Sequence, residues 1–476
     1  MARPEFDLVV IGGGAGGLVV AAGGAQLGAK VALAEKHKLG GDCLWYGCVP
    51  SKTLLASARI AHRMRHADRW ALAPHDPRPD LARVMERVAG VIRDIEPNDS
   101  PERFRGLGVD VIFGAGRFVD RDTFDVAGRR LTARSFVIAT GSRPAIPNIP
   151  GLDGVGHLTN ETLFDLREPV PHLIVLGAGP IGCEMAQAFR RLGSEVTVID
   201  LAPAILPRED ADFAGVVFRQ LLAEGVRFHL GASIAQVERT VSGLRALIRD
   251  REGTPRPVDA THLLVAVGRL ANLDSLGLDA AGVEIDQGRV VLRDGLQTTN
   301  RRIYAVGDAA GGYQFTHLAE HHAGVVLRQT LFRMTWAKPA TVIPWCTFTD
   351  PELARVGLSA TEAHKTGVAH RVYDFPFADI DRARTEGETE GRARIVTSPR
   401  GKLLGAAVVG PHAGEIIAEY ALALTKGMSA ADLSATIHAY PTLAQINRRV
   451  ADRRRNEGLT PTARAWLKRI FRLRGG

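Results

Sequence analysis

The chain has 476 residues, 45% of them hydrophobic, which is too long for one core and predicts about three domains. Four cysteines exclude a secreted disulfide scaffold, and because the sequence shows no export leader and no apolar run of about 18 residues, we expect a cytoplasmic protein. The formal net charge of the chain is +8, and the segment from Arg448 to Arg474 alone carries a net charge of +8. The rest of the chain is therefore neutral, and we expect no nucleic-acid partner.

The chain opens with the pattern of a dinucleotide-binding unit. Residues 7–11 form an apolar run that predicts a strand, followed by G-x-G-x-x-G with its glycines at Gly12, Gly14 and Gly17. A second strand is predicted over residues 30–35 and ends in Glu35, at the distance from Gly17 where a ribose hydroxyl needs an acceptor. This order of elements favours nucleotide binding over glycines that only allow close helix packing.

Two cysteines five positions apart follow this unit. Positions i and i+5 of a regular helix point about 140° apart, so a bond between Cys43 and Cys48 needs a distorted turn, which Gly47 permits. Pro50 suits the first turn of a following helix, whose N-terminal dipole would favour a thiolate at Cys48. Half of a zinc site is the alternative, but no second Cys or His cluster lies nearby in the sequence. The pattern favours thiol redox chemistry beside a nucleotide, with no resident metal.

The glycine unit then recurs. A second apolar run over residues 173–176 precedes Gly177, Gly179 and Gly182, and another predicted strand ends at Asp200. The three glycines and the acid all follow their counterparts in the first unit by the same distance along the chain. A duplicated spacing of this kind is not expected by chance, so the chain is predicted to bind two dinucleotides.

A third acid lies at a strand end further along. Residues 298–308 predict a strand followed by Gly307 and Asp308, a carboxylate placed to accept hydrogen bonds from polyol hydroxyls such as those of a flavin ribityl chain. From Pro344 onward, strand-like runs alternate with helical patterns over residues 415–426 and 443–454.

The last residues, 459–476, predict a basic amphipathic tail. Apolar side chains from Trp466 to Leu473 recur at helical spacing among basic ones. Two partners fit this tail: the surface of a partner subunit, or an anionic membrane or acidic membrane protein, giving peripheral membrane contact.

Together these motifs resemble those of the FAD-dependent pyridine nucleotide-disulfide oxidoreductases of class I, which include glutathione reductase, dihydrolipoyl dehydrogenase and mercuric reductase. The resemblance runs from about residue 5 to about residue 455. It implies an α/β fold with two Rossmann-like dinucleotide-binding domains, for FAD and NAD, and a C-terminal α+β dimerisation domain. A homodimeric enzyme is therefore expected.

The resemblance also divides the chain, with Pro147, Pro150 and Gly151 marking the first domain crossing and Asn272 the second. The FAD-binding domain is expected over residues 1–150 and 272–343, and the NAD(P)-binding domain over residues 151–271. The dimerisation domain is expected over residues 344–458, and the tail over residues 459–476.

The cofactor contacts that the resemblance implies fall on the motifs already described. The FAD adenosine half would be held by Gly12, Gly14, Gly17 and Glu35, and the ribityl-pyrophosphate region by Gly307 and Asp308. Thr140, Gly141 and Gly268 match strand ends that join the nucleotide domains, and His317 and Ala319 match a helix start whose backbone N–H groups face the flavin.

The nicotinamide cofactor would be held by Gly177, Gly179, Gly182 and Asp200. Because a carboxylate at Asp200 accepts a hydrogen bond from a ribose 2′-hydroxyl but repels a 2′-phosphate, NADH is expected over NADPH.

The same resemblance implies the catalytic roles. Cys43 would be the interchange thiol that meets substrate, and Cys48 the thiol that faces the flavin. Lys52 and Glu184 match an ion pair near flavin N5, where a fixed cation would also contact the cofactor and stabilise negative charge on the reduced ring.

The sequence departs from the disulfide-reducing relatives in its third domain. Those enzymes carry His-Pro-Thr with a Glu five residues after the His, a pair that protonates a departing thiolate. Here Tyr440 replaces the His and Gln445 the Glu. A phenol with a pKa near 10 is a poor proton shuttle at pH 7. His438 is the alternative proton donor, because i and i+2 share a face in an extended segment.

A Tyr at this position is similar to the pattern of mercuric reductase. Two features of that enzyme are missing here: no cysteine follows Cys346, and no metal-binding module precedes Asp7. We expect a mercuric-reductase-like enzyme that passes electrons from NAD(P)H through FAD and the Cys43/Cys48 disulfide to a thiol-reactive acceptor. Soft metal ions, small disulfides, quinones and persulfides remain open as acceptors. The alternatives are a dihydrolipoyl dehydrogenase and, from another class, a membrane-recruited electron-transfer flavoprotein.

Overall fold

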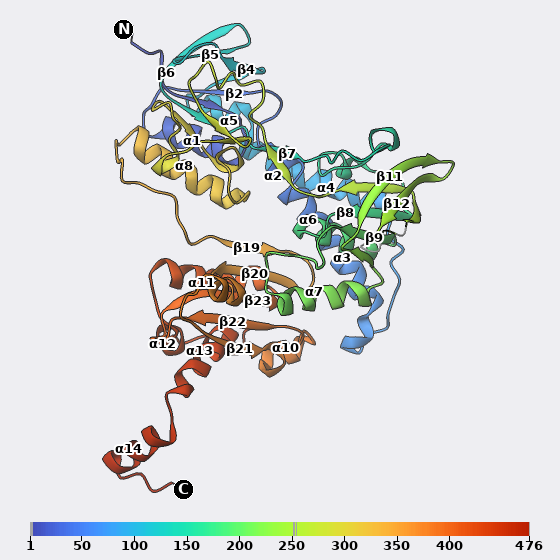
Figure 1. Ribbon diagram of the computed structural model, residues 1–476, viewed down its shortest axis with the longest axis vertical. Coiled ribbons are helices and arrows are strands. Elements are labelled where there is room, and N and C mark those ends of the chain that lie inside the picture. The colour runs from blue at the N-terminus through green and yellow to red at the C-terminus, as the bar shows by residue number, and fades with distance from the viewer. Residues whose placement is uncertain (1–2, 251–252, 254, 476) are drawn as a thin grey trace.

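The computed structural model describes residues 3–250, 253 and 255–475. Figure 1 shows three bodies, with one helix, α14, projecting from the last of them. Among the described residues, no helix combines the length and the apolar character that crossing a membrane requires. The mixed α/β architecture expected from the sequence is confirmed.

The first body is built on a parallel sheet whose strands are apolar on both faces, as burial between two layers requires. Strand β1 lies at its centre, paired with β2 on one side and β6 on the other. Helices α1 and α8 pack against each other on this sheet. The parallel strands in order and the two helices are β3 (Asp110–Phe113), β2 (Val31–Glu35), β1 (Phe6–Ile11), β6 (Arg129–Ile138), β18 (Ile303–Ala305), α1 (Ala15–Gln26) and α8 (Thr316–Thr330). The strands β4 (Gly116–Phe118) and β5 (Thr123–Val126) extend β6 as an antiparallel meander.

The second body repeats this arrangement. Strand β8 lies between β9 and β14 just as β1 lies between β2 and β6, and all of these pairs are parallel. In both sheets the strand order reverses beside the central strand, and a crevice for a nucleotide forms at the carboxyl end of that strand. The elements are β10 (Arg227–Leu230), β9 (Glu195–Asp200), β8 (His172–Leu176), β14 (His262–Val265), α6 (Pro180–Arg191), α7 (Ala211–Ala223) and the antiparallel β11 (Ser233–Thr240), β12 (Gly243–Arg249) and β13 (Pro255–Ala260).

Two features connect these bodies. The antiparallel pair β7 (Ser142–Pro144) and β15 (Arg269–Ala271) holds the two crossing segments together. Helix α3 (Cys48–Arg65) packs on α6, so the cysteine segment extends from the first body to the second. The neighbouring helices are α2 (Gly41–Trp45), α4 (Leu81–Ile95) and α5 (Pro101–Gly106).

The third body is a five-stranded antiparallel sheet with helices packed on it, the α+β unit expected from the sequence. Its strands, in spatial order, are β19 (Pro344–Thr347), β20 (Glu352–Gly357), β23 (Leu403–Gly410), β22 (Arg392–Thr397) and β21 (Arg371–Pro376). Its helices are α9 (Ala360–Lys365), α10 (Asp381–Glu386), α11 (Ala413–Thr425), α12 (Ala430–Ala435) and α13 (Gln445–Glu457), followed by α14 (Pro461–Phe471).

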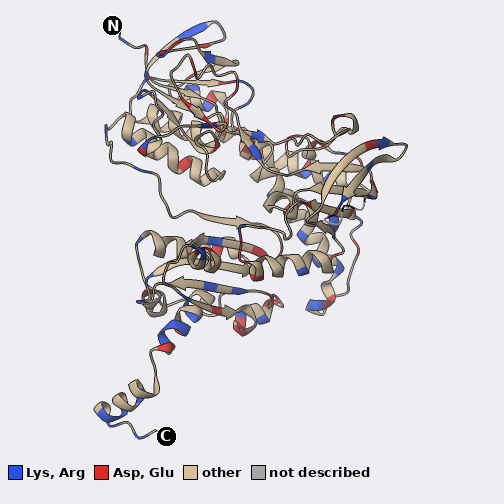
Figure 2. Cartoon of the chain, viewed as in Figure 1, with Lys and Arg blue, Asp and Glu red and all other residues tan. Residues whose placement is uncertain are grey.

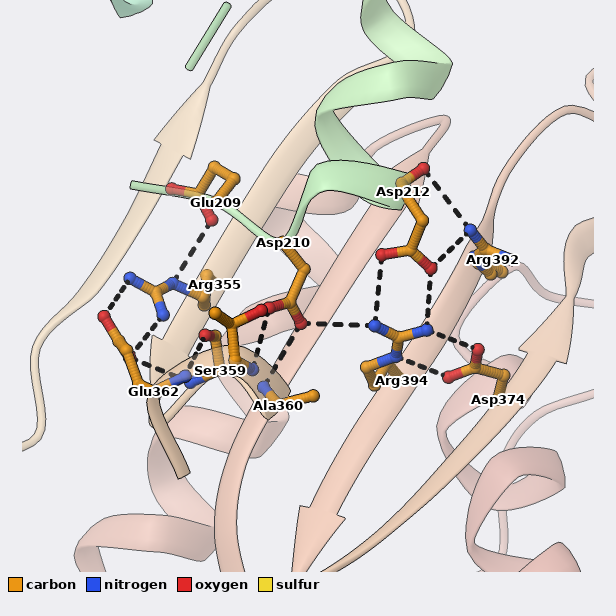
Figure 3. A network of polar contacts seen from close by, with 11 residues as sticks. Glu209, Asp210, Asp212, Arg355, Ser359, Ala360, Glu362, Asp374, Arg392 and Arg394 are labelled. Carbon is orange, nitrogen blue, oxygen red and sulfur yellow. Dashed lines mark hydrogen bonds and ion pairs between the residues drawn. The ribbon is translucent and has the colours of Figure 1, made fainter. Parts of the chain in front are cut away.

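A network of acids and arginines joins the start of α7 in the second body to the third body (Figure 3). Arg355 on β20 is 2% exposed, forms an ion pair with Glu209 at 3.2 Å and donates two hydrogen bonds to Glu362. Arg394 on β22 bridges Asp212 and Asp374. The Arg355 and Glu209 side chains are both buried, and removing one partner of such a pair leaves a buried charge without compensation.

Replacing Arg355 with methionine is expected to lower the free energy of unfolding by about 3–5 kcal/mol, because Glu209 is left buried without its cation. Chemical denaturation followed by circular dichroism measures the loss. The double variant Arg355→Met with Glu209→Gln removes the unpaired buried charge. It is expected to recover part of the lost free energy of unfolding. A double variant no more stable than Arg355→Met would contradict this account.

Candidate functional site

The first glycine loop leaves β1 in a conformation that only glycine adopts easily. Gly12 has φ of +107°, and a Cβ at Gly17 would lie 1.9 Å from the Gly12 carbonyl oxygen, so the two glycines allow the turn and the close helix contact. A Cβ on Gly14 would meet only Gly41, at 3.7 Å, which leaves open space above the N-terminus of α1. That space and the free N–H groups of the helix start suit a pyrophosphate.

Glu35 is fixed at the end of β2 beside this loop. Its Oε2 accepts a hydrogen bond from the Gly13 N–H at 2.6 Å, and its Oε1 accepts one from the His37 N–H at 2.8 Å. A carboxylate has about four lone-pair sites, so two remain for ribose hydroxyls. The loop and the acid therefore fit the adenosine half of FAD.

The second glycine loop has the same geometry. Gly177 has φ of +115°, a Cβ at Gly182 would lie 1.9 Å from the Gly177 oxygen, and a Cβ at Gly179 would meet no atom within 4 Å. Asp200 accepts hydrogen bonds from the Ala178 N–H at 2.5 Å and the Ala202 N–H at 2.7 Å. The second site therefore fits a nicotinamide dinucleotide in the same way.

The two thiols lie together where α2 gives way to α3. Cys48 is the first residue of α3, where the helix dipole favours a thiolate, and Cys43 lies within hydrogen-bonding reach of it. The Thr316 hydroxyl at the start of α8 lies 3.4 Å from the Cys48 sulfur. Both cysteines are free thiols here.

The environment divides the proton between these thiols. The pKa of Cys48 is lowered to about 6, first because Cys43 donates a hydrogen bond to its sulfur, and further by Thr316 and the Lys52 cation, while burial opposes the shift. The pKa of Cys43 is raised, first by its hydrogen bond to Cys48 and then by burial. The reduced pair is thus a thiolate at Cys48 beside a thiol at Cys43.

Lys52 lies one turn beyond Cys48 on α3. Its Nζ donates a hydrogen bond to Glu184 Oε2 at 2.8 Å and lies 4.4 Å from the centroid of the Phe348 ring. The other oxygen of Glu184, whose side chain is 5% exposed, accepts from the Phe348 N–H at 2.9 Å. The ion pair joins the cysteine helix, α6 and the third body at one point.

Asp308 follows β18 in the short helical turn Gly307–Ala310. Its Oδ2 accepts a hydrogen bond from Ser142 Oγ at 2.5 Å, and Arg269 donates to the same hydroxyl at 2.7 Å. Burial raises the pKa of Asp308, opposed by Ser142 and Arg269. Arg269 also forms an ion pair at 3.0 Å with Asp42, the residue before Cys43. A single arginine therefore connects the expected ribityl acid to the thiol segment.

The remaining residues that the sequence assigns to the flavin lie around this point. Thr140 donates to the Asn272 carbonyl at 2.7 Å, while Gly141 and Gly268 lie at the two strand ends joined by β7 and β15. His317 Nε2 lies 2.8 Å from the Pro344 carbonyl oxygen. A Cβ added to Gly307 would lie 2.9 Å from the Ala319 Cβ, so Ala319 packs closely on Gly307.

Tyr440 and Gln445 do not join this cluster within the chain. Both lie in the third body, near the start of α13, and Figure 1 places that helix apart from α2. Tyr440 is 69% exposed, and its hydroxyl donates to Asp381 at 3.1 Å. His438 does not share its orientation, because the His438 side chain is 7% exposed and contacts Glu419 at 3.0 Å and the Thr436 carbonyl at 3.1 Å.

Several side chains of the cluster had no role assigned to them from the sequence, among them Thr316, Ser142 and Arg269. Thr316 adjoins the predicted His317, and Ser142 and Arg269 flank the predicted Gly141 and Gly268. Each of these three residues is next to a residue that the sequence did assign to the site. Their own contacts, however, are with residues more than a hundred positions away in the sequence.

Comparison with known proteins matches the chain to one family. The model of the pyridine nucleotide-disulphide oxidoreductases matches residues 6–323, and the model of their dimerisation domain matches residues 343–450. The chain belongs to this family. As a pyridine nucleotide-disulphide oxidoreductase it is an FAD-dependent enzyme, and its dimerisation domain indicates a homodimer.

Relatives with different substrates are similarly close to this oxidoreductase. It is 36% identical over 448 residues to the dihydrolipoyl dehydrogenase of Chlamydia muridarum, covering 93% of this chain and 95% of that one. It is 34% identical over 443 residues to the mercuric reductase of Bacillus cereus, covering 93% and 70%. Among solved structures, the Cu(II) complex of the HOCl-induced flavoprotein disulfide reductase RclA from Escherichia coli superimposes with a TM-score of 0.84 at 26% identity, covering 94% and 99%.

Proposed function

We propose that this oxidoreductase takes electrons from NADH and passes them through FAD and the Cys43/Cys48 pair to a thiol-reactive acceptor, as a mercuric reductase does. The observation that carries the proposal is the placement of the thiol pair: Cys48 begins α3 with the Thr316 hydroxyl 3.4 Å from its sulfur. The hydrogen bond from Cys43, and then Thr316 and Lys52, lower the pKa of Cys48 to about 6. A low-pKa thiolate beside a neutral thiol suits two-electron exchange, because one sulfur can hold charge while the other reacts.

Each residue has a role in this proposal. When bound, FAD supplies the two-electron step between the nicotinamide and the disulfide. Cys48 holds the thiolate toward the flavin, and Cys43 meets the acceptor. Lys52, held by Glu184, keeps a positive charge near the cofactor, where it offsets negative charge on the reduced ring. Arg269 positions the thiol segment through Asp42.

The third body supports an acceptor that needs no proton for a leaving thiolate. Tyr440 and Gln445 do not contact the thiols of their own chain, so we infer that they face the thiols of the second copy in the dimer. Neither is an acid–base group suited to pH 7. His438 is held by Glu419 and by a backbone carbonyl, and its side chain is nearly buried, which argues against its serving as a proton donor.

A dihydrolipoyl dehydrogenase is the second candidate, favoured by the 36% identity to relatives of that name. An acceptor screen separates the two, with NADH oxidation followed against Hg(II) in excess thiol, Cu(II), lipoamide, glutathione disulfide and a quinone. The proposal expects a soft metal ion to give the highest kcat/KM. Lipoamide turnover well above that of every metal ion would move the assignment to dihydrolipoyl dehydrogenase.

NADH is expected to exceed NADPH in kcat/KM by at least about tenfold, because the Asp200 carboxylate, held by two backbone N–H groups at the end of β9, would repel a 2′-phosphate bound at that strand end. Arg208 is the nearby cation that could instead reach a 2′-phosphate, and its guanidinium lies 5.8 Å from the centroid of the Tyr313 ring. Steady-state kinetics of the wild type and of Asp200→Asn, which removes the charge, measure the effect. Asp200→Asn should reduce the ratio of kcat/KM for NADH to kcat/KM for NADPH. A wild type with the higher kcat/KM for NADPH would contradict the expected preference.

In the reduced protein, the Cys48 thiolate is expected to persist above about pH 6 and to be lost below it. The Thr316 hydroxyl stabilises the charged form, so Thr316→Val should raise the pKa and leave less thiolate slightly above that pH. The rate of iodoacetamide labelling at Cys48 against pH measures this midpoint. Thr53→Val on the same helix, whose hydroxyl bonds the Val49 carbonyl, is the matched control and should leave the midpoint unchanged.

A further inference from the structure

Helix α14 carries an apolar face that nothing in the described chain covers. Trp466, Ile470 and Phe471 are 59%, 61% and 65% exposed, and Leu467 is 37% exposed. No residue of this helix is buried. In a folded body these side chains would be covered by neighbouring elements, so their joint exposure indicates that a partner covers them.

The charges of α14 lie on the other side of the helix. At 100° per residue, Trp466, Leu467 and Ile470 share one face, and Arg464, Lys468 and Arg469 lie around the opposite one. Thr460 caps the helix by accepting a hydrogen bond from the Ala463 N–H at 3.1 Å. The sequence contains no Asp or Glu after Glu457, so every charged side chain on this segment is basic.

The helix stands clear of the catalytic body. Figure 1 shows α14 beyond the third body, joined to α13 by a short link, and Figure 2 shows basic residues along both helices. Within the described chain, no side-chain hydrogen bond or ion pair joins α14 to another element. Because the rest of the chain is neutral, the segment from α13 to the C-terminus carries the whole excess of positive charge.

We propose that α14 docks on an anionic lipid surface and holds the enzyme there. An apolar face with a Trp at its edge, opposite basic side chains, suits the boundary between acyl chains and acidic headgroups. The 11-residue helix is about 16 Å long and a bilayer core about 30 Å thick, so the helix lies in the interface. Each basic residue near an anionic surface adds about fivefold to the affinity.

The charge complementarity selects lipid over the partner subunit. Docking on a second copy would place five cations, from Arg464 to Arg474, against a body with no net negative charge to receive them. An anionic bilayer offers that charge and an apolar layer together. The inference does not depend on the electron acceptor, because it concerns a helix outside the thiol site.

The FAD-loaded full-length protein should sediment with vesicles of phosphatidylcholine and phosphatidylserine mixed two to one, but not with phosphatidylcholine alone, and high salt should release it. The variant Arg464→Gln, Lys468→Gln, Arg469→Gln should bind about a hundredfold more weakly. The variant Trp466→Ser, Ile470→Ser should also lose binding. Arg83→Gln, Arg130→Gln, Lys365→Gln removes the same charge from exposed sites on the body and should bind as the wild type does.

Two results would overturn the proposal. One is equal sedimentation of the wild type and the tail-charge variant, which would show that α14 does not carry the binding. The other is dissociation of the homodimer in sedimentation velocity when residues 460–476 are removed, which would show that the tail docks on the partner subunit. NADH oxidation by the variants in solution should stay at the wild-type rate.

Discussion

Replacing Cys43 with serine is expected to reduce turnover with any acceptor by more than about 10³-fold and to produce a long-wavelength absorbance without added reductant. The remaining Cys48 has no disulfide partner, and its thiolate is stabilised at the start of α3 by Thr316 and Lys52. When FAD is bound, contact between that thiolate and the oxidised flavin would give the charge-transfer band. The serine hydroxyl can still donate the hydrogen bond that Cys43 donates in the native protein.

Cys48→Ser tests the opposite assignment. It should lose turnover to the same extent but show no such band, because the thiolate facing the flavin is gone. Cys43→Ala is the informative comparison, since it removes the hydrogen bond and should move the appearance of the band to higher pH than in Cys43→Ser. Identical spectra for Cys43→Ser and Cys48→Ser would refute the proposed division of roles.

The second large effect concerns the proton donor of the third body. If lipoamide and glutathione disulfide are reduced slowly because no group protonates the departing thiolate, then Tyr440→His with Gln445→Glu should raise that activity by about 10²-fold. The change restores an imidazole and a carboxylate at positions that the fold already presents near the start of α13. Steady-state kinetics with each disulfide measure the gain.

Hg(II) reduction in excess small thiol is the control for this variant, and it should show no comparable gain. His438→Gln tests the alternative that His438 is the proton donor, because it removes the imidazole held by Glu419 while leaving Tyr440 in place. It should not alter lipoamide turnover. Efficient lipoamide reduction by the wild type, lost in His438→Gln, would favour dihydrolipoyl dehydrogenase with His438 as its proton donor.

The sequence alone determined the features that lie close together along the chain. The two glycine loops, each followed at the same distance by an acid, and the cysteine pair at Cys43 and Cys48 are local spacings that hold whatever surrounds them. The same is true of the tail, where helical spacing separates apolar from basic side chains within a single short helix. The domain boundaries and the roles of the site residues stay predictions of the family resemblance.

Only the tertiary structure decided which distant side chains surround the thiols. Thr316 is 268 residues from Cys48, and Arg269 reaches Asp42 across the β7/β15 crossing, contacts that no local spacing encodes. It also turned His438 inward onto Glu419 while leaving Tyr440 exposed, although extended geometry placed both on one face. The physical reason is that local periodicity sets the direction of a side chain relative to its own element, whereas the packing of separate bodies sets what that side chain meets.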